Sequence, residues 1–321
     1  MTSGPVILIP GDDPPQIQET PHLERLKDHG DVRLYVTRPQ SRAEKLDRAA
    51  DADIIVNTRG LVGWDAEDFA SLPKLKMLTT CSIGTDMFDL AAAKAYRKVI
   101  CNVPLATVPM VAEHLFGLVL AVAKQAAFQT VEIKAGRWLK PFNVYLAGKT
   151  LGIVGTGNIG SEVARLARAI GMNVVAWTFN PSPSRAAELG VTFVTLDELL
   201  QRSDVVSLNV RLMPDTEGLI GARELAMMKE DAILVNGARG KVLDMEALCD
   251  ALEAGRLYGV GLDVFPEEPV PAGARILGFD RVVLTPHAAD QTPEAIDAVN
   301  AGAVDNVIAF LEGRPQNVVN R

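Results

Sequence analysis

The chain has 321 residues, of which 48% are hydrophobic and 22% are charged, and its formal net charge is −8. This length favours two domains, and the composition is typical of a folded globular protein, which excludes a disordered or fibrous one. The acidic balance argues against a general binder of nucleic acid or of anionic membranes, because both kinds of binding depend on clustered Lys and Arg.

Short apolar runs alternate with charged, helix-like stretches along the N-terminal third of the chain. Strands are predicted at 6–10, 32–36, 52–57, 75–80 and 99–103. A long apolar helix is predicted over 109–128, and a connector rich in aromatic residues follows over 129–148. A second alternating series begins at "TLGIVG" and ends at "VVLTPH". The alternation predicts an α/β protein in which helices cover parallel sheets.

The start of the chain leads directly into the strand-like "PVILIP", with no basic flank, and no run approaches the roughly 20 apolar residues of a membrane span. We therefore expect no signal peptide, no membrane partner and a cytoplasmic location. Cys81, Cys101 and Cys249 lie far apart and lack metal-ligand spacing. They are expected to be reduced, buried thiols, and no metal site is predicted.

The second series opens with "VGTGNIG", in which Gly155, Gly157 and Gly160 lie between an apolar strand pattern and a helix pattern. In a dinucleotide site the first glycine permits a tight turn, the second lets the backbone approach a pyrophosphate, and the third lets the helix pack on the strand. The strand–turn–helix context therefore predicts a dinucleotide site rather than an ordinary glycine turn.

Three later stretches place chemically active side chains directly after strand patterns. "VNGARGKVLD" contains Arg239, whose guanidinium can bind a carboxylate through two hydrogen bonds. "GLDVFPEEP" supplies an acidic loop, and "LTPH" ends at His287. Because the carboxyl ends of parallel strands line the ligand crevice of an open sheet, these groups are expected to converge.

Together these motifs resemble the D-isomer-specific 2-hydroxyacid dehydrogenase family over essentially the whole chain. The matching stretches are, in order, "CSIGTDMFDL", "CNVP", "VPMVAEH", "GKTLGIVGTGNIG", "SDVVSLNVRLMPDTEGLIG", "ARG", "GLDVF", "EP" and "TPH". Their order and spacing are far more specific than any single motif.

The resemblance implies an α/β fold with two Rossmann-like domains, each a doubly wound parallel sheet, and an active-site cleft between them. The substrate (catalytic) domain would be flavodoxin-like and discontinuous, with residues 1–101 joined by 288–321. Residues 102–287 would form the NAD(P)-binding Rossmann domain. A homodimer is also implied, with the helix and arm at 109–148 in its interface.

The family mechanism transfers to three residues of this sequence. Arg239 would bind the carboxylate of a 2-oxo acid or 2-hydroxy acid substrate, and His287 would exchange a proton with the substrate oxygen as hydride moves to or from the nicotinamide. Glu268 would orient His287 and stabilise its imidazolium form. Glu267 is a rival for this role, but the position directly before Pro269 is the one that matches the family.

The remaining implied contacts fall into two groups. The substrate carboxylate would receive further hydrogen bonds from the backbone at Ser82, Ile83 and Gly84. The cofactor would be bound by Gly155, Gly157, Asn158, Ile159, Gly160, Thr178, Asn180, Arg185, Val210, Ala238 and Asp263, of which Ala238 and Asp263 would hold the nicotinamide carboxamide.

Two charged or titratable residues have open interpretations. Arg59, in "NTRG", is a candidate for a second anionic group on the substrate, and a surface or structural role is the alternative. His114 lies in the apolar helix pattern, which favours a packed core or interface histidine over a catalytic one.

Three positions depart from the family pattern. Asn209 stands where many relatives carry His, and "AYRKVI" lacks a glycine usually found there. At the ribose-binding position the usual acid is replaced by Thr178, which removes the repulsion that excludes a 2′-phosphate. Asn180 and Arg185 add groups that can bind such a phosphate. The alternatives are that Thr178 or Asn180 binds a free ribose hydroxyl and that Arg185 faces solvent on the following helix. The cofactor is therefore NAD or NADP, with a slight preference for NADP.

The sequence leaves two other functions as alternatives. A dehydrogenase of formate or phosphite is disfavoured because formate-type relatives carry Gln in place of Glu268. A cofactor-sensing, corepressor-like binding protein would keep the same three residues, although no long disordered tail supports it.

Overall fold

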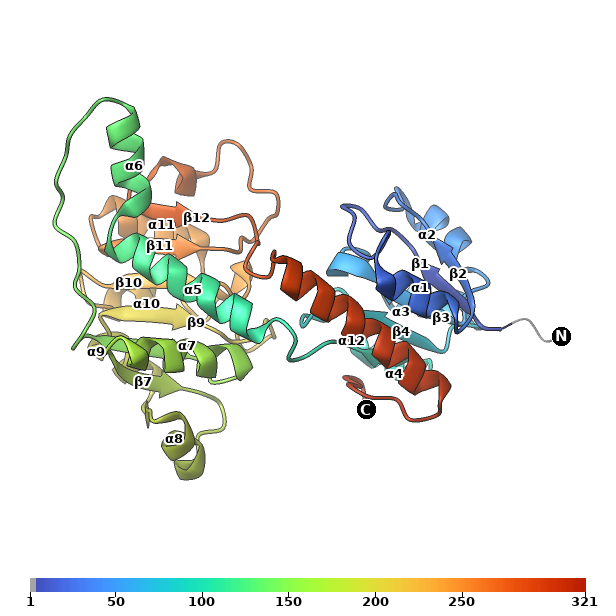
Figure 1. Cartoon of the computed structure of the whole chain (residues 1–321). Coiled ribbons are helices and arrows are strands. Elements are labelled where there is room, and N and C mark those ends of the chain that lie inside the picture. Colours follow the sequence, from blue (N-terminus) through green and yellow to red (C-terminus); the bar gives the residue numbers. More distant parts are fainter. Residues whose placement is uncertain (1–3) are drawn as a thin grey trace. The chain divides into compact units, whose positions relative to one another are not determined.

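The computed structural model describes residues 4–321, which form two compact units. Unit 1 consists of the chain up to Thr107 together with Gln291–Arg321, and unit 2 consists of Val108–Asp290. Each unit is a parallel sheet covered by helices on both faces, which confirms the predicted fold class of two doubly wound α/β domains (Figure 1).

Unit 1 contains a five-stranded parallel sheet with the order β2-β1-β3-β4-β5, which is the flavodoxin-like order. The strands are β1 (Val6–Ile9), β2 (Asp31–Leu34), β3 (Ile54–Asn57), β4 (Met77–Thr80) and β5 (Val99–Cys101). The helices are α1 (Pro21–Lys27), α2 (Arg42–Ala49), α3 (Ala66–Ser71), α4 (Leu90–Ala95) and α12 (Pro293–Leu311).

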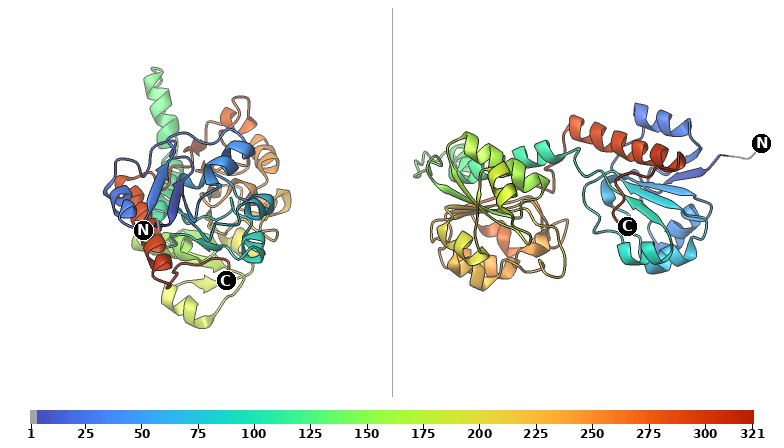
Figure 2. Two further views of the ribbon diagram at one scale, coloured as in Figure 1. Left: turned by 90° about the vertical axis from the view of Figure 1, so that its right-hand side faces the viewer. Right: turned by 90° about the horizontal axis from the view of Figure 1, so that it is seen from below.

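The last helix of the chain completes unit 1. Helix α12 lies beside α1 on one face of the sheet, where Val299 and Val304 are buried against strand residues such as Ile54 (Figure 2). The other face packs against α2, α3 and α4, with Phe69 fully buried. The two faces bury alternate residues of the inner strands β1, β3 and β4, whereas the edge strand β2 carries the exposed Asp31 and Arg33.

Unit 2 contains a seven-stranded parallel sheet with the order β12-β11-β10-β9-β6-β7-β8. Its strands are β6 (Thr150–Val154), β7 (Asn173–Trp177), β8 (Thr192–Phe193), β9 (Val205–Leu208), β10 (Ile233–Asn236), β11 (Gly259–Leu262) and β12 (Val282–Leu284). The strand order reverses between β6 and β9, and such a switch point is where open α/β sheets bind ligands at the carboxyl ends of their strands.

The helices of unit 2 cover both faces of this sheet. They are α5 (Val108–Ala123), α6 (Ala126–Lys134), α7 (Asn158–Ala169), α8 (Pro183–Leu189), α9 (Leu196–Arg202), α10 (Ala222–Met227) and α11 (Met245–Glu253). Three 3-10 turns complete the elements of the two units: η1 (Thr58–Gly60), η2 (Gly240–Val242) and η3 (Arg275–Gly278). One core joins α5 and α7 to the sheet, and another joins α9, α10 and α11 to its opposite face.

The helix predicted over 109–128 is two helices. Helix α5 ends at Ala123, Gln125 adopts a left-handed backbone conformation with φ of 47°, and α6 continues at an angle of 57°. The predicted connector correspondingly starts as helix and leaves the helix only after Lys134, with a turn at 135–136. Tertiary contacts explain the break, because the Gln125 side chain donates hydrogen bonds to the hydroxyl of Tyr258 and to the carbonyl of Phe142.

No single helix among residues 4–321 is long and apolar enough to cross a membrane. The bent pair α5 and α6 meets the length and composition test only when taken together, and most of the apolar residues of α5 are buried in unit 2. The three cysteines are buried and free of disulfides, as the sequence predicts.

Candidate active site

The glycine turn of unit 2 connects β6 to α7, and its geometry explains each glycine. Gly155 has φ of 100°, and a Cβ there would lie 2.8 Å from Val210 Cγ1. A Cβ on Gly160 would lie 2.0 Å from the carbonyl oxygen of Gly155, so that only glycine lets the helix approach the turn. Gly157 differs from both, because its Cβ would meet nothing within 4 Å.

The open space at Gly157 and the start of α7 fit a phosphate-bearing cofactor. Gly157 is the N-cap residue of α7 and provides no side-chain cap, and Asn158 and Ile159 form the first turn of that helix. The backbone N–H groups of a first helical turn have no partner within the helix and favour an anion. The glycine at position 157 therefore leaves the space beside the first turn of α7 open to an anion.

The residues predicted to surround the adenosine ribose lie after β7. Thr178 directly follows this strand and is half-buried, whereas Asn180 is exposed. Arg185, on α8, turns back to the glycine turn: its Nη2 atom donates to Ser161 Oγ over 3.0 Å and to the carbonyl of Thr156 over 3.4 Å. Its Nη1 atom binds Glu188 over 3.0 Å. The guanidinium is thus held beside the first turn of α7 rather than extended into solvent.

Three neighbouring strands of unit 2 carry the predicted catalytic side chains at their carboxyl ends. Arg239 follows β10, Glu268 lies in the loop after β11, and His287 follows β12. The Nη1 atom of Arg239 donates to the carbonyl of Ala238 over 2.7 Å, and Ala238 N donates to the Asn236 side chain over 3.0 Å. The sheet order therefore brings these three loops to one edge of unit 2.

Glu268 and His287 are in direct contact. His287 Nδ1 lies 2.8 Å from Glu268 Oε2, and Glu268 Oε1 accepts a hydrogen bond of 2.9 Å from the backbone N–H of Phe265. A carboxylate can only accept, so the assignment that satisfies this contact puts a proton on Nδ1. Nε2 is then the ring nitrogen that exchanges a proton with another molecule.

Asp263 holds the loop that carries His287. The carboxylate is 1% exposed and accepts hydrogen bonds from Thr285 Oγ1 and from the backbone N–H groups of Ala288 and Ala289. Its own carbonyl accepts the N–H of His287 over 2.8 Å. Burial raises the pKa of Asp263, but the hydrogen bonds from His114, Thr285 and Ala288 outweigh burial and hold that pKa below its usual value.

His114 and Thr285 also belong to this cluster, although neither was predicted to do so from the sequence. His114 Nε2 lies 3.0 Å from Thr285 Oγ1 and 3.3 Å from Asp263 Oδ1, so His114 has polar partners and is not simply packed in the core. The "TPH" motif contains Thr285 two positions before His287, and this spacing was the available signal. For His114, no pattern along the chain connects α5 to β11 and β12.

In unit 1 the loop after β4 contains Ser82, Ile83 and Gly84. The Ser82 hydroxyl donates to the carbonyl of Gly84 over 2.9 Å, and the carbonyl of Ile83 accepts from Asn102 Nδ2 over 2.7 Å. The neighbouring loop after β3 approaches it closely, since a Cβ on Gly60 would lie 3.5 Å from Ser82 Oγ.

Arg59 lies in that neighbouring loop of unit 1, with φ of 57°. Its backbone N–H donates to Gln16 Oε1 over 3.0 Å, and its guanidinium donates to the carbonyl of Pro15 and to the side chain of Gln291. Arg59 is therefore fixed by oxygens of neutral groups on the loop before α1 and at the start of the C-terminal segment.

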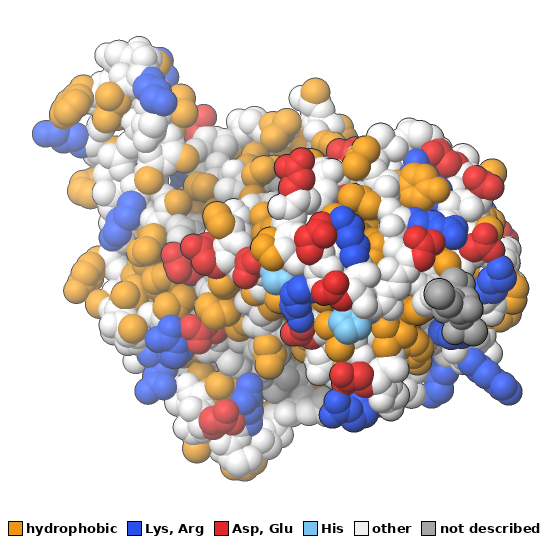
Figure 3. Space-filling view, turned by 45° about the vertical axis from the view of Figure 1, so that its right-hand side comes forward, with side chains coloured by type: hydrophobic (Ala, Val, Ile, Leu, Met, Phe, Trp, Pro, Cys, Tyr) orange, Lys and Arg blue, Asp and Glu red, His pale blue; other side chains and the backbone are white. Residues whose placement is uncertain are grey.

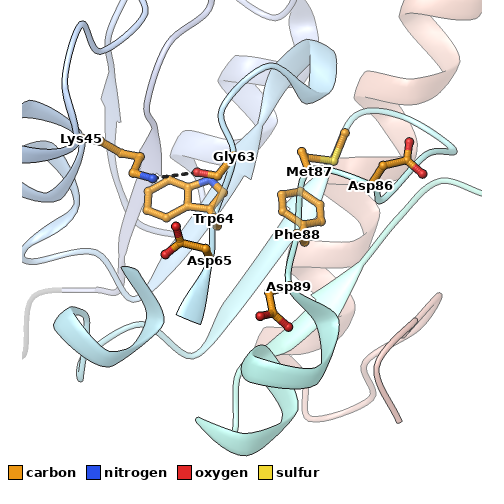
Figure 4. A pocket seen from close by; sticks show the side chains of 8 residues that line it. All are labelled: Lys45, Gly63, Trp64, Asp65, Asp86, Met87, Phe88 and Asp89. Atoms are coloured by element: carbon orange, nitrogen blue, oxygen red, sulfur yellow. Dashed lines mark hydrogen bonds between the residues drawn. The ribbon is translucent and has the colours of Figure 1, made fainter. Parts of the chain in front are cut away.

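A hollow of about 570 Å³ on unit 1 is separate from these residues. It is lined by Lys45, Gly63, Trp64, Asp65, Asp86, Met87, Phe88 and Asp89 (Figure 4). Lys45 Nζ donates to the carbonyl of Gly63 over 2.8 Å and lies 5.0 Å from the centroid of the Trp64 ring. None of the lining residues is among the predicted catalytic or cofactor-binding residues, and we assign the hollow no role.

Comparisons with known proteins agree with this geometry. Residues 116–289 match the family model described as D-isomer specific 2-hydroxyacid dehydrogenase, NAD binding domain. A glyoxylate reductase of Korarchaeum cryptofilum is 36% identical over 311 residues, which cover 93% of this chain and 92% of that protein.

Two solved structures are similar over nearly the full length. The crystal structure of a glyoxylate reductase from Paecilomyes thermophila has a TM-score of 0.91 and 31% identity, and the match covers 99% of each chain. An acyclic imino acid reductase, Bsp5, in complex with NADPH and D-Arg has a TM-score of 0.88 and 27% identity, with 98% of this chain and 99% of that chain covered. This chain belongs to the D-isomer-specific 2-hydroxyacid dehydrogenase family and is an oxidoreductase that transfers hydride between NAD(P)H and a 2-oxo acid/2-hydroxy acid pair.

Proposed function

We propose that His287, Glu268 and Arg239 carry the chemistry of this enzyme. The observation that supports the proposal most strongly is the contact of 2.8 Å between His287 Nδ1 and Glu268 Oε2. When bound, the nicotinamide supplies or accepts the hydride. In reduction His287 donates the Nε2 proton to the substrate carbonyl oxygen, and Glu268 stabilises the imidazolium before that transfer. In oxidation Nε2 accepts the proton of the hydroxyl group.

Arg239 binds the substrate carboxylate in this proposal. A planar guanidinium matches the two oxygens of a carboxylate. That the backbone N–H groups at Ser82, Ile83 and Gly84 donate to the substrate carboxylate stays a prediction. Ala238 and Asp263 hold the nicotinamide carboxamide, and a contact of Arg59 with a second anionic group of the substrate stays a prediction.

We infer a slight preference for NADP over NAD. Thr178 leaves the ribose position without a carboxylate, and Arg185 lies beside the first turn of α7 through Ser161 and Thr156. A guanidinium held there is well placed for a 2′-phosphate. The test compares KM for NADPH and NADH in the wild type, Arg185→Gln and Thr178→Asp. A rise in KM for NADPH alone in Arg185→Gln supports the preference, and equal changes for both cofactors contradict it.

We infer a homodimer from the segment formed by α6 and residues 135–148. Apolar side chains are exposed along it: Val131, Ile133, Trp138, Leu139, Phe142 and Tyr145. Figure 3 shows hydrophobic side chains interspersed with Lys and Arg side chains on the projecting end of unit 2. Large exposed apolar patches mark interaction sites. Light scattering should give a dimer for the wild type and a smaller mass for Trp138→Ser with Phe142→Ser, and a monomeric wild type contradicts the inference.

The predicted cytoplasmic location stays a prediction.

The first experiment measures initial rates with NADPH and NADH on glyoxylate, hydroxypyruvate, pyruvate and phenylpyruvate. We expect turnover of at least one 2-oxo acid and its loss in Arg239→Ala and His287→Ala. Full activity in either variant removes that residue from the proposed mechanism. Tight cofactor binding without turnover on a broad panel of 2-oxo acids contradicts the proposed substrates and favours the corepressor-like alternative, for which cofactor-dependent capture of a partner is the next test.

A further inference from the structure

His114 and Thr285 form a hydrogen-bonded chain to the buried Asp263. Helix α5 packs against β10, β11 and β12 and brings His114 to the carboxyl end of β12, where its side chain is 24% exposed. Nε2 of His114 lies 3.0 Å from Thr285 Oγ1, which in turn donates to Asp263 Oδ1 over 2.6 Å. All of these residues belong to unit 2.

The direction of these hydrogen bonds follows from the chemistry of the groups. The Asp263 carboxylate only accepts, so the single hydroxyl proton of Thr285 is used in the bond to Oδ1. The Thr285 oxygen can then only accept from the imidazole, and His114 must carry a proton on Nε2. That N–H also faces Asp263 Oδ1 at 3.3 Å, so it helps to satisfy a carboxylate that is almost completely buried.

The same carboxylate determines the conformation of the loop that carries His287. Asp263 Oδ1 and Oδ2 accept the N–H groups of Ala288 and Ala289, and the Asp263 carbonyl accepts the N–H of His287. His287 itself has φ of 50°, in the left-handed region that a residue with a Cβ rarely adopts. Such a conformation persists only where the surrounding contacts determine it. The orientation of the Asp263 carboxylate therefore affects where the His287 ring lies.

We propose that His114 is a positioning residue: by donating from Nε2 to Thr285 and Asp263 it holds the 285–289 loop in the conformation that presents His287. The proposal rests on the proposed role of His287 as the group that exchanges the proton. Thr285 and Asp263 lie between His114 and the loop that carries His287. His114 therefore affects the reaction only through the conformation of that loop.

Two amide substitutions separate this role from simple packing. The amide nitrogen of His114→Gln can reach the position of Nε2, whereas the shorter side chain of His114→Asn cannot. Both side chains are polar and uncharged, so they differ mainly in reach. Lys124→Met, directly after the end of α5, is not a suitable control, because Lys124 Nζ donates a hydrogen bond to the carbonyl of Val144. The exposed Glu113→Gln, at the adjacent position of α5, is the matched control.

The first readout is hydrogen exchange of the protein without cofactor or substrate. In His114→Asn we expect the amides of His287, Ala288 and Ala289 to exchange about threefold to tenfold faster, which corresponds to the loss of one hydrogen bond. Exchange in β6 and β10 should stay at the wild-type rate, and His114→Gln and Glu113→Gln should behave as wild type throughout. Equal exchange in wild type and His114→Asn overturns the proposal.

The second readout is steady-state kinetics. We expect kcat to fall about tenfold to a hundredfold in His114→Asn, since misplacing a catalytic group by about 1 Å has effects of this size, while KM for the cofactor changes little. Recovery of most of kcat in His114→Gln supports the proposal that a donor at the position of Nε2 holds the loop. Equal losses of kcat in His114→Asn and His114→Gln overturn it. If the wild type turns over no 2-oxo acid, the proposed function fails, and the exchange experiment still decides whether His114 holds the loop.

Discussion

His287 Nδ1 lies 2.8 Å from Glu268 Oε2, although the two residues are 19 positions apart and follow different strands. The pair can form because β11 and β12 are parallel neighbours, so the loops at their carboxyl ends meet. A histidine whose Nδ1 is bound to a carboxylate has a defined tautomer and a stabilised imidazolium form.

Glu268→Gln should lower kcat by about tenfold or more, and His287→Ala by about a hundredfold to ten-thousandfold. The amide keeps the shape of the side chain but removes the charge that stabilises the imidazolium. Stopped-flow and steady-state rates with the best 2-oxo acid provide the measurement. Glu267→Gln is the matched control and should retain nearly full activity. A larger loss of activity in Glu267→Gln than in Glu268→Gln would show that Glu267, and not Glu268, supports His287 in the reaction.

Gly157→Ala and Gly160→Ala should separate cofactor binding from folding. A Cβ at position 157 meets nothing within 4 Å, so Gly157→Ala should change the free energy of unfolding by no more than about 1 kcal/mol and still weaken cofactor binding. A Cβ at position 160 would lie 2.0 Å from the Gly155 carbonyl, so Gly160→Ala should destabilise the protein by about 1–3 kcal/mol and also impair binding.

Calorimetric titration with NADPH and NADH, together with urea unfolding, distinguishes the two glycine variants. Unchanged cofactor affinity in Gly157→Ala would show that the phosphates do not approach this turn. Equal destabilisation of both variants would contradict the prediction that the space beside Gly157 is open to the cofactor and is not filled by protein atoms.

Asp263→Asn should reduce the dependence of stability on acidic pH. Burial raises the pKa of Asp263, but the hydrogen bonds from His114, Thr285 and Ala288 lower it by more than burial raises it. The folded-state pKa therefore lies below the ordinary 3.8. A lowered folded-state pKa contributes stability above the unfolded-state value, and this contribution is lost as pH falls through that value and then through the folded-state pKa.

The expected result is a difference in Tm between wild type and Asp263→Asn that is largest near neutral pH and shrinks as pH falls below about 4. Thermal melts from pH 7 to pH 3 provide the measurement. Asp215→Asn, at an exposed position, serves as the control and should give only a small difference in Tm from the wild type. A difference in Tm for Asp263→Asn that widens in acid would contradict a lowered folded-state pKa of Asp263.

The three cysteines should not react with a thiol reagent in the folded protein. Burial raises the pKa of Cys101 to about 12 and raises the pKa of Cys81 and of Cys249 above the usual value, so little thiolate is present at neutral pH. Titration with Ellman's reagent should count three thiols in denaturant and none within minutes under native conditions. Rapid reaction of one thiol in the native protein would show that its surroundings open readily.

Local patterns in the sequence were sufficient for the fold class and the glycine turn. The alternation of apolar strands with helical stretches follows from burial on both faces of a parallel sheet, and each predicted strand of unit 1 overlaps an observed one. Gly155 and Gly160 can be identified from sequence because the turn tolerates no side chain at either position. Arg239 and His287 were identified because they directly follow strand patterns, and Glu268 was chosen over Glu267 because its position before Pro269 resembles that of a known family.

Tertiary structure decided three features that no local pattern contains. The helix predicted over 109–128 breaks at Gln125, where the side chain binds Tyr258 and the Phe142 carbonyl across the fold. Arg185 turns back to Ser161 instead of extending into solvent.

The third feature is the chain of contacts from His114 through Thr285 to Asp263. His114 and Thr285 are 171 positions apart, and only the packing of α5 on the sheet brings them within 3.0 Å. The sequence by itself therefore determined the fold class and the chemical groups available to the site. Which groups touch depends on contacts between distant segments, because side-chain hydrogen bonds act over about 3 Å and leave no periodic pattern along the chain.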